Sequence, residues 1–276
     1  MSEKETWRII RDGARPGAEN MAVDEAIARA VGRGDCPPTL RLYRWEPATV
    51  SLGYFQRTAR AVDRDYLARH GLGLVRRPTG GRAVMHDREL TYSVALPDDH
   101  PLARGSVEQS YYRLSLCLVR GLTLLGARLS LSEPALHGRG ETAACFDAPS
   151  RHELMAEGRK LVGSAQVRRW GALLQHGSIL IDLDVERLAG SLGITAAVAR
   201  RLAATRMSWL GRVLGYSPGP EEVAVAVEAG FAEALGAPLV PDGLTPEERR
   251  LADRLVAGKY GTDRWNLEGR GEEFEL

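Results

Sequence analysis

The most informative segment of the chain reads RRPTGGRAVMHD, from Arg76 to Asp87. Its paired glycines, Gly80 and Gly81, let the backbone approach a ligand closely and present N–H groups to it. Strand-like runs before and after the segment, at 72–77 and 90–96, are expected to hold it as a loop between rigid elements. A glycine pair alone is more often a plain turn, so the segment needs support from the rest of the chain.

On the N-terminal side of this loop, the sequence predicts one helix and a pair of strands. Met21 to Val31 has apolar residues at four-residue spacing, and Asn20 is placed to cap the helix. Thr39 to Trp45 and Thr49 to Tyr54 alternate as strands do, with a proline-containing turn between them. We expect these two strands to form an antiparallel hairpin.

On the C-terminal side, the capping-box pattern Ser106-x-x-Gln109 predicts the start of a long helix. The periodicity is then lost from Ser132 to Glu157, which predicts a long loop of the kind that is usually functional or disordered. Arg159 to Arg168 alternates like a strand. This alternation predicts that Lys160 and Ser164 project to the same side of a sheet.

The last third of the chain is expected to be mostly helical, with a linker from Pro238 to Leu244. Strands followed by helices, without strict alternation of the two, indicate the α+β class. We therefore divide the chain into a catalytic domain at 1–244 and a small helical extension at 245–276. The expected helices are Val185 to Leu192, Ala196 to Ala204, Pro220 to Leu235 and Pro246 to Ala257.

The composition is that of a globular protein, with 276 residues, 44% of them hydrophobic and 26% charged, and a formal net charge of +1. No apolar run approaches the roughly 18 residues that cross a bilayer, and Met1 to Ile10 lacks the apolar centre of a signal peptide. We expect a cytoplasmic protein without a membrane partner. The near-neutral charge and the lack of a basic tail argue against nucleic acid as a partner.

Cysteine and lysine are both scarce, and their positions are therefore informative. The cysteines are too few for a disulfide framework and show no CxxC metal spacing, so no metal site is predicted. Among the 37 lysines and arginines only three are lysines, and Lys160 is the one in mid-chain. Lysine can shift its pKa when buried, whereas arginine effectively cannot. The three cysteines are Cys36, Cys117 and Cys145.

Several segments resemble the biotin and lipoate protein ligase superfamily, over roughly Trp7 to Leu183. The RRxxGG…HD pattern is fairly specific to that superfamily, and the strand LTYSVAL that follows it fits as well. The resemblance implies a mostly antiparallel or mixed central sheet flanked by helices, with a small helical C-terminal extension. The other matches are Asn20-x-Ala22-x-Asp24-Glu25, Gly158-Arg159-Lys160-Leu161-Val162-Gly163-Ser164-Ala165-Gln166 and Gln175-His176-Gly177-Ser178-Ile179-Leu180.

The resemblance also implies roles for individual residues. In ligases of the superfamily the conserved strand lysine, here Lys160, contacts the carboxyl end of the acid, and the glycine-pair loop wraps the acyl chain. Gly80-Gly81-Arg82 and the loop residue Cys145 are similar to the octanoyltransferase branch that loads the glycine cleavage H protein, in which the loop cysteine carries the acyl group. The expected substrate-binding residues are Arg77, Thr79, Gly80, Gly81, His86, Gly163, Ser164, Ala165, His176 and Gly177.

The chemistry of Cys145 and Lys160 supports this expectation. An unperturbed thiol has a pKa of about 8.5, and a nearby ammonium lowers that pKa and populates the thiolate. The Cys145 thiolate is expected to attack the thioester of octanoyl-acyl carrier protein, the donor. The target lysine of the H protein or another lipoyl domain then attacks the octanoyl-enzyme. Because the donor is already activated, no cofactor is expected.

The protein partners of such a reaction are commonly acidic, so an arginine-rich face is a candidate docking surface. A solvated arginine surface balanced by neighbouring acids explains the same residues equally well. The arginines concerned are Arg57, Arg60, Arg64, Arg76, Arg77, Arg82 and Arg88.

Four alternatives remain open from the sequence. An ATP-dependent lipoate, octanoate or biotin ligase would use Lys160 to stabilise an acyl-adenylate, with Cys145 incidental. An amidotransferase would move octanoate from the H protein to other lipoyl domains. A non-catalytic protein would keep the acid pocket alone. A papain-like hydrolase would pair Cys145 with His152 or His176, but nothing else in the sequence supports it.

Overall fold

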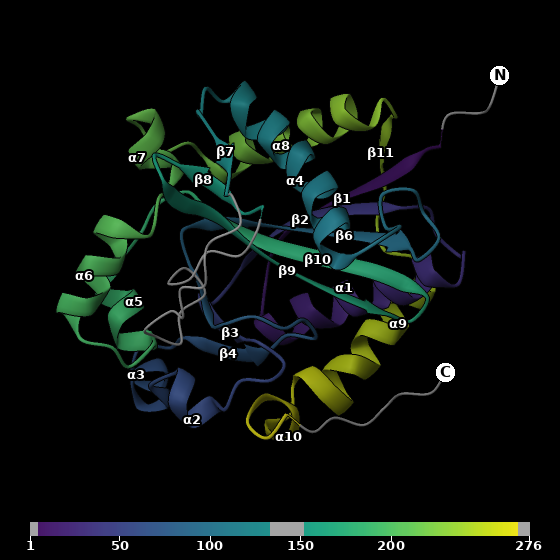
Figure 1. Cartoon of the computed structure of the whole chain (residues 1–276). Coiled ribbons are helices and arrows are strands. Elements are labelled where there is room, and N and C mark those ends of the chain that lie inside the picture. The colour runs from purple at the N-terminus through teal and green to yellow at the C-terminus, as the bar shows by residue number, and fades with distance from the viewer. Residues whose placement is uncertain (1–4, 133–151, 270–276) are drawn as a thin grey trace.

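A computed structural model describes residues 5–132 and 152–269 of the chain. It has a mixed sheet of eight strands, a second sheet of three strands, and helices on both faces of the larger sheet (Figure 1). This arrangement confirms the α+β class and the mixed central sheet flanked by helices.

The larger sheet is parallel at one end and antiparallel over the rest. β11, β1 and β2 run parallel, whereas the pairs from β2 to β7 are antiparallel. The spatial order is β11 (Leu239–Pro241), β1 (Trp7–Arg15), β2 (Thr39–Trp45), β6 (Glu89–Pro97), β10 (Ala172–Leu180), β9 (Arg159–Arg169), β8 (Leu154–Ala156) and β7 (Ser130–Leu131).

The smaller sheet is built around the glycine-pair loop. Its order is β4 (Gly73–Arg76), β3 (Thr49–Leu52) and β5 (Val84–His86), with β3 parallel to β4 and antiparallel to β5. The expected hairpin of β2 with β3 is wrong, because β2 pairs with β1 and β6 in the larger sheet. All four residues of β3 are buried. Their alternating pattern predicted a strand correctly but carried no information about its partners.

Four helices of the described ranges form the layers on the two faces of the larger sheet. α4 (Val107–Leu124) and α8 (Pro220–Leu235) pack together against one face, while α1 (Gly17–Gly32) covers the other face and α9 (Pro246–Leu255) packs on α1 (Figure 1). The capping box at the start of α4 is confirmed. Asn20 is not a cap, because α1 begins earlier and places Asn20 in its first turn, where its amide donates to the carbonyl oxygens of Arg15 and Arg44.

The remaining helical segments are short and lie around the edges of the sheets. None of the helices in the described ranges is long and apolar enough to span a bilayer. The segments are α2 (Thr58–Ala61), α3 (Arg64–Arg69), α5 (Val185–Ser191), α6 (Ala196–Thr205), α7 (Leu210–Leu214), the π-helical turn η2 (Val256–Tyr260) and α10 (Asp263–Asn266).

The C-terminal helical part makes buried contacts with the rest of the fold. β11 lies within the expected linker and pairs with β1. The Lys259 ammonium donates to Glu25 of α1 at 2.6 Å, and so does the Tyr260 hydroxyl. The Arg76 guanidinium donates to the carbonyl oxygens of Trp265 and Asn266. A domain boundary at residue 244 stays a prediction.

Candidate active site

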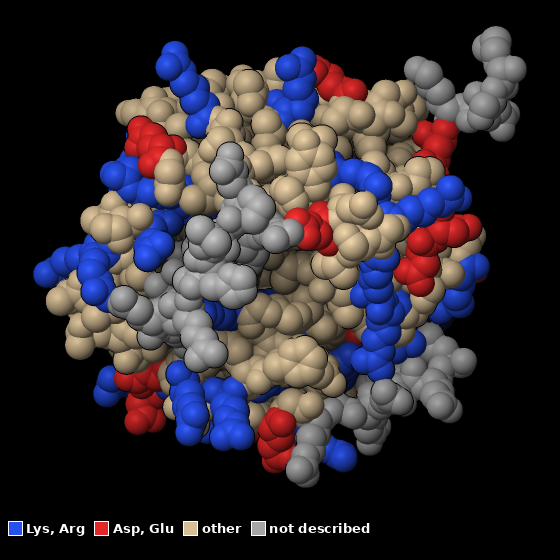
Figure 2. Space-filling view, in the orientation of Figure 1, with Lys and Arg blue, Asp and Glu red and all other residues tan. Residues whose placement is uncertain are grey.

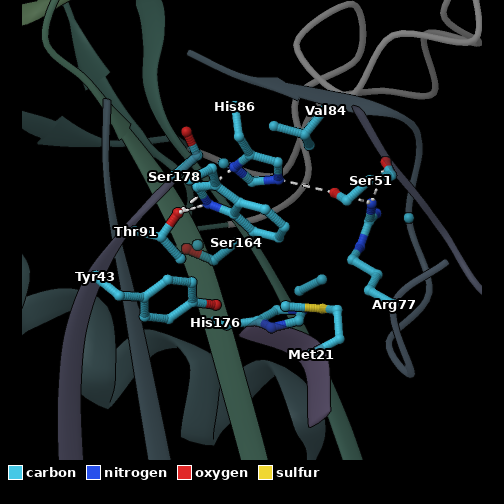
Figure 3. A pocket seen from close by; sticks show the side chains of 15 residues that line it. Met21, Tyr43, Ser51, Arg77, Val84, His86, Thr91, Ser164, His176 and Ser178 are labelled. Carbon is cyan, nitrogen blue, oxygen red and sulfur yellow. Dashed lines mark hydrogen bonds between the residues drawn. The ribbon is translucent and has the colours of Figure 1, made fainter. Parts of the chain in front are cut away.

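A pocket lies where the larger and smaller sheets meet, beside the start of α1 (Figure 3). Eight of the ten predicted substrate-binding residues line it. The remaining walls, whose residues the sequence analysis did not assign to substrate binding, come from β2, β3, β5, β6, β10 and α1. The predicted lining residues are Arg77, Gly81, His86, Gly163, Ser164, Ala165, His176 and Gly177, and the others are Met21, Tyr43, Trp45, Ser51, Val84, Thr91 and Ser178.

Arg77 shapes the glycine-pair loop from within. Its guanidinium donates to Thr79 Oγ1 at 3.1 Å and to the carbonyl oxygens of Gly80 and Arg82 at 2.8 and 2.7 Å. Gly81 has φ +92°, and a Cβ there would lie 2.8 Å from the Arg77 Nη2. Glycine is needed at this position because other residues rarely adopt such a backbone conformation. Thus Thr79 and Gly80 serve the loop's shape and do not line the pocket.

His176 connects the loop to the centre of the protein. Its Nδ1 lies 3.1 Å from Asp24 Oδ2, and its Nε2 lies 2.7 Å from the Thr79 hydroxyl. The Asp24 carboxylate accepts hydrogen bonds, so it orients His176 with the proton on Nδ1. With the proton on Nδ1, Nε2 is the ring nitrogen left to accept the hydrogen bond of the Thr79 hydroxyl. His176 thereby positions the loop through Thr79.

Asp24 is the centre of this network. Its Oδ1 accepts from Arg41 Nη1 at 2.7 Å and from the Ser93 hydroxyl at 2.8 Å, and its Oδ2 accepts from the Tyr43 hydroxyl at 2.8 Å. Burial raises the pKa of Asp24, but the His176 hydrogen bond and the Arg41 charge outweigh burial and hold that pKa below its ordinary value. The motif containing Asp24 was visible in the sequence, whereas its role required the structure.

His86 is held on the opposite wall. Its Nε2 lies 2.8 Å from the Ser51 hydroxyl, and its ring stacks on Trp45 with 4.1 Å between centroids (Figure 3). Burial lowers the pKa of His86, and the nearby Glu89 offsets this effect only in part. The neutral ring therefore acts as a fixed wall of the pocket and a partner for Ser51.

Lys160 lies near the start of β9, where the strand is irregular. Leu154 of β8 pairs with Val162, but the next residue, Met155, pairs with Lys160, so β9 carries one extra residue there. Leu154 and Val162 belong to the core beneath α4 and α8, and Met155 and Lys160 therefore face the other side of the sheet. Ser164 points its hydroxyl into that core, so its predicted projection on the same side as Lys160 is wrong. Such bulges commonly re-aim a side chain beside an active site.

The Lys160 ammonium is buried and paired. It donates to Glu153 Oε1 at 2.5 Å, and both side chains are 2% exposed. The backbone of Lys160 is held by Arg206 and Ser208. Because an unpaired buried charge is costly, Glu153 stabilises the ammonium on the face of the sheet that also carries His176 and Ser178. No periodicity in the sequence marked Glu153.

The two cysteines within the described residues are poor nucleophiles. Cys36 and Cys117 are both buried free thiols. Burial raises the pKa of Cys36 and raises that of Cys117 to about 12, so neither thiol ionises readily near neutral pH. Cys145, the predicted nucleophile, lies outside the described residues.

The surface near the pocket is rich in arginine, but Arg76 and Arg77 do not belong to it. They are only 1% and 4% exposed, so including them in the docking face was wrong. Figure 2 shows basic side chains, with acidic ones among them, over α2 and α3, below a hollowed area whose visible atoms are mostly uncharged. The other arginines of the expected face, exposed or half-buried, are Arg57, Arg60, Arg64, Arg82 and Arg88. Across the described ranges, no group of three or more His, Cys, Asp or Glu side chains is arranged to hold a metal ion.

Known proteins share both the sequence and the fold. The chain is 50% identical to Octanoyltransferase LipM of Kyrpidia tusciae over 271 residues, which are 95% of this chain and 98% of the relative. A bi-partite lipoate protein ligase from Thermoplasma acidophilum superposes with a TM-score of 0.82 at 28% identity, covering 98% and 100% of the two chains. A lipoate-protein ligase A bound with ATP has a TM-score of 0.80 at 29% identity, covering 96% and 100%.

The family model for the lipoyl protein ligase A/B catalytic domain matches residues 16–232. That range holds the glycine-pair loop, the pocket walls and Lys160, and the family likeness therefore coincides with the site. The chain belongs to the lipoyl protein ligase A/B catalytic domain family.

Proposed function

We propose that the protein transfers an octanoyl group from octanoyl-acyl carrier protein to the lipoyl-domain lysine of the glycine cleavage H protein, through a thioester on Cys145. The name of the K. tusciae relative, an octanoyltransferase, supports the transferred group. The observation that carries the mechanism is the buried Lys160 ammonium on the pocket face of β9.

The acyl chain is assigned to the pocket between the glycine-pair loop and the β9–β10 pair. Trp45, Met21 and Val84 supply apolar walls there. Arg77 and His176 keep the loop in the shape that closes over the chain. An alkyl chain gains free energy from such burial, at about 25 cal/mol per Å² removed from water.

Lys160 is assigned to the activation of Cys145. A positive charge in a site of low dielectric favours the thiolate over the thiol. In the first half-reaction, the thiolate attacks the donor thioester and the carrier thiolate leaves. In the second, the acceptor amine attacks the octanoyl-enzyme, loses a proton to a base and expels the Cys145 thiolate. The raised pKa values of Cys36 and Cys117 favour Cys145 for this role.

An ATP-dependent lipoate or octanoate ligase is the second candidate. The likeness to a lipoate-protein ligase A bound with ATP supports it. In that reaction Lys160 would stabilise an acyl-adenylate, and Cys145 would carry nothing. The two candidates therefore differ in nucleotide dependence and in the need for the thiol. Amidotransfer between lipoyl domains differs from both in its donor, an octanoylated H protein.

The carrier and lipoyl domains are proposed to dock on the arginine face. Arg57, Arg60 and Arg64 lie on or next to α2 and α3 and are exposed. Attraction between this face and acidic partners weakens as salt is added. The KM for the donor is therefore expected to rise with ionic strength, and a salt-insensitive KM would argue against this docking face.

The test of the proposed function is transfer from octanoyl-acyl carrier protein to the H protein without nucleotide. The wild type is expected to octanoylate the acceptor lysine, and Lys160→Ala to lose most of this activity. Lys160→Arg is the matched control, since it keeps a charge beside Glu153. An absolute requirement for ATP would contradict the proposal and favour the ligase. If the thiol pKa of Cys145, measured from the pH dependence of its alkylation, is unchanged in Lys160→Ala, Lys160 does not activate it.

A further inference from the structure

Ser178 differs from the other hydroxyl side chains of the pocket in its hydrogen bonding. It is 1% exposed, and its Oγ has no hydrogen-bond partner among the residues that the structure describes. The other hydroxyl side chains of the lining are all engaged: Ser51 with His86, Thr91 with Glu89, Tyr43 with Asp24, and Ser164 with Tyr92.

A buried hydroxyl without a partner requires an explanation, because buried polar atoms in folded proteins are almost always hydrogen-bonded. Ser178 is one of the residues that line the pocket, so a ligand bound there can supply the missing partner. A saturated acyl chain is apolar except at its carbonyl end. In an octanoyl thioester, the carbonyl oxygen is the strong acceptor that this hydroxyl can satisfy.

The position of Ser178 fits the carbonyl end of the chain. Ser178 lies two residues from His176 on the same face of β10, and it is paired with Gly163 of β9. Lys160 lies further along β9 on that face, as the bulge at the start of the strand dictates. Ser178 therefore lies on the pocket face of the sheet between two places. One is the part of the pocket beneath the glycine-pair loop, and the other is the Lys160 ammonium.

We propose that the Ser178 hydroxyl donates a hydrogen bond to the carbonyl oxygen of the bound octanoyl group. This assignment rests on the proposed function. When the Cys145 thiolate attacks, the new S–C bond forms and the C=O electron pair moves onto that oxygen. The Ser178 hydroxyl stabilises the resulting oxyanion. The pair then returns, the bond to the carrier sulfur breaks, and the carrier leaves as a thiolate.

The test compares Ser178→Ala with Ser191→Ala in the full-length protein. Ser191, at the end of α5, also has a buried hydroxyl without a partner within the described residues, but it lies outside the pocket lining. Both substitutions remove an unpartnered oxygen, so neither should lower the melting temperature. The rate of Cys145 octanoylation is expected to fall about 100-fold in Ser178→Ala, as for loss of an oxyanion donor, and to stay unchanged in Ser191→Ala.

A second measurement reads the hydrogen bond itself. In octanoyl-enzyme labelled with ¹³C at the carbonyl, the infrared C=O band is expected at higher frequency in Ser178→Ala than in the wild type. Equal octanoylation rates and equal band positions in the two proteins would overturn the assignment while leaving the proposed function intact. A wild type that forms no octanoyl-enzyme at all would overturn both.

Discussion

Asp24→Asn tests the role of the buried network around Asp24, because its effect on transfer can be measured separately from its effect on stability. Asp24 accepts hydrogen bonds from Arg41, Ser93, Tyr43 and His176. Asparagine keeps one acceptor oxygen but places an amide donor against the Tyr43 hydroxyl or the His176 Nδ1 proton. Loss of one partner of a buried ion pair costs about 3–5 kcal/mol. We expect the lower end, about 3 kcal/mol, because Arg41 retains the carboxylate of Asp12.

The expected effect on transfer is separate from that on stability. Without a carboxylate to orient it, His176 no longer fixes the Thr79 hydroxyl, and the glycine-pair loop loses an anchor. A displacement of about 1 Å in a substrate-positioning element can cost about 100-fold in rate. We therefore expect transfer per folded molecule to fall by about that factor. Urea unfolding gives the first quantity, and an octanoyl-transfer assay on the folded fraction gives the second.

Asp12→Asn is the matched control for Asp24→Asn. Asp12 is the other carboxylate that binds Arg41, and it makes no contact with His176. Its loss should cost about 2 kcal/mol, as for a hydrogen bond to a charged group, with transfer unchanged. Equal stability and equal transfer activity of Asp24→Asn and Asp12→Asn would contradict the role assigned to Asp24.

Three further predictions concern the walls and anchors of the pocket. Because burial lowers the pKa of His86, the unfolded chain binds a proton at this residue more readily than the folded protein does. The free energy of unfolding should therefore fall as pH drops below about 6.5. His86→Gln should lose this part of the pH dependence, as measured by urea unfolding at several pH values. Arg76→Lys should free the 262–267 segment to limited proteolysis, since a lysine cannot reproduce the guanidinium bonds to Gly53, Trp265 and Asn266, and an unchanged digest would contradict this. Gly81→Ala should raise the KM for the octanoyl donor, because its Cβ meets Arg77 in a backbone conformation that suits glycine, and an unchanged KM would show that the loop's shape does not limit binding.

The sequence was informative where local chemistry determines local structure. The strands around the glycine pair, the capping box at Ser106 and the strand at β9 are local signals, and the structure confirms each of them. The predicted alternation along β9 fails at its start, where the bulge puts Lys160 and Ser164 on opposite faces. The resemblance located most of the pocket lining because its motifs carry those residues. The helix start at Gly17 was missed because a following asparagine looked like a cap although it is buried inside the helix.

The sequence could not predict contacts between residues that lie far apart along the chain. The partners of β3 lie 20 or more residues away, and its wholly buried pattern suits any central position. The bulge that turns Lys160 toward the pocket face arises from pairing with β8, not from β9 alone. Glu153 pairs with Lys160 only because β8 and β9 lie side by side. That Ser178 Oγ finds no hydrogen-bond partner within the described ranges depends on all of its neighbours there together.

The proposed mechanism requires the acyl group to travel on Cys145. Its most direct test is intact-mass analysis after the protein is mixed with octanoyl-acyl carrier protein in the absence of nucleotide, with Cys117→Ala as the control for a buried thiol. The wild type and Cys117→Ala are expected to form a hydroxylamine-labile octanoyl adduct, and Cys145→Ala is expected to form none. If no adduct appears, and Cys145→Ala still transfers octanoate at the wild-type rate, the thioester mechanism is contradicted.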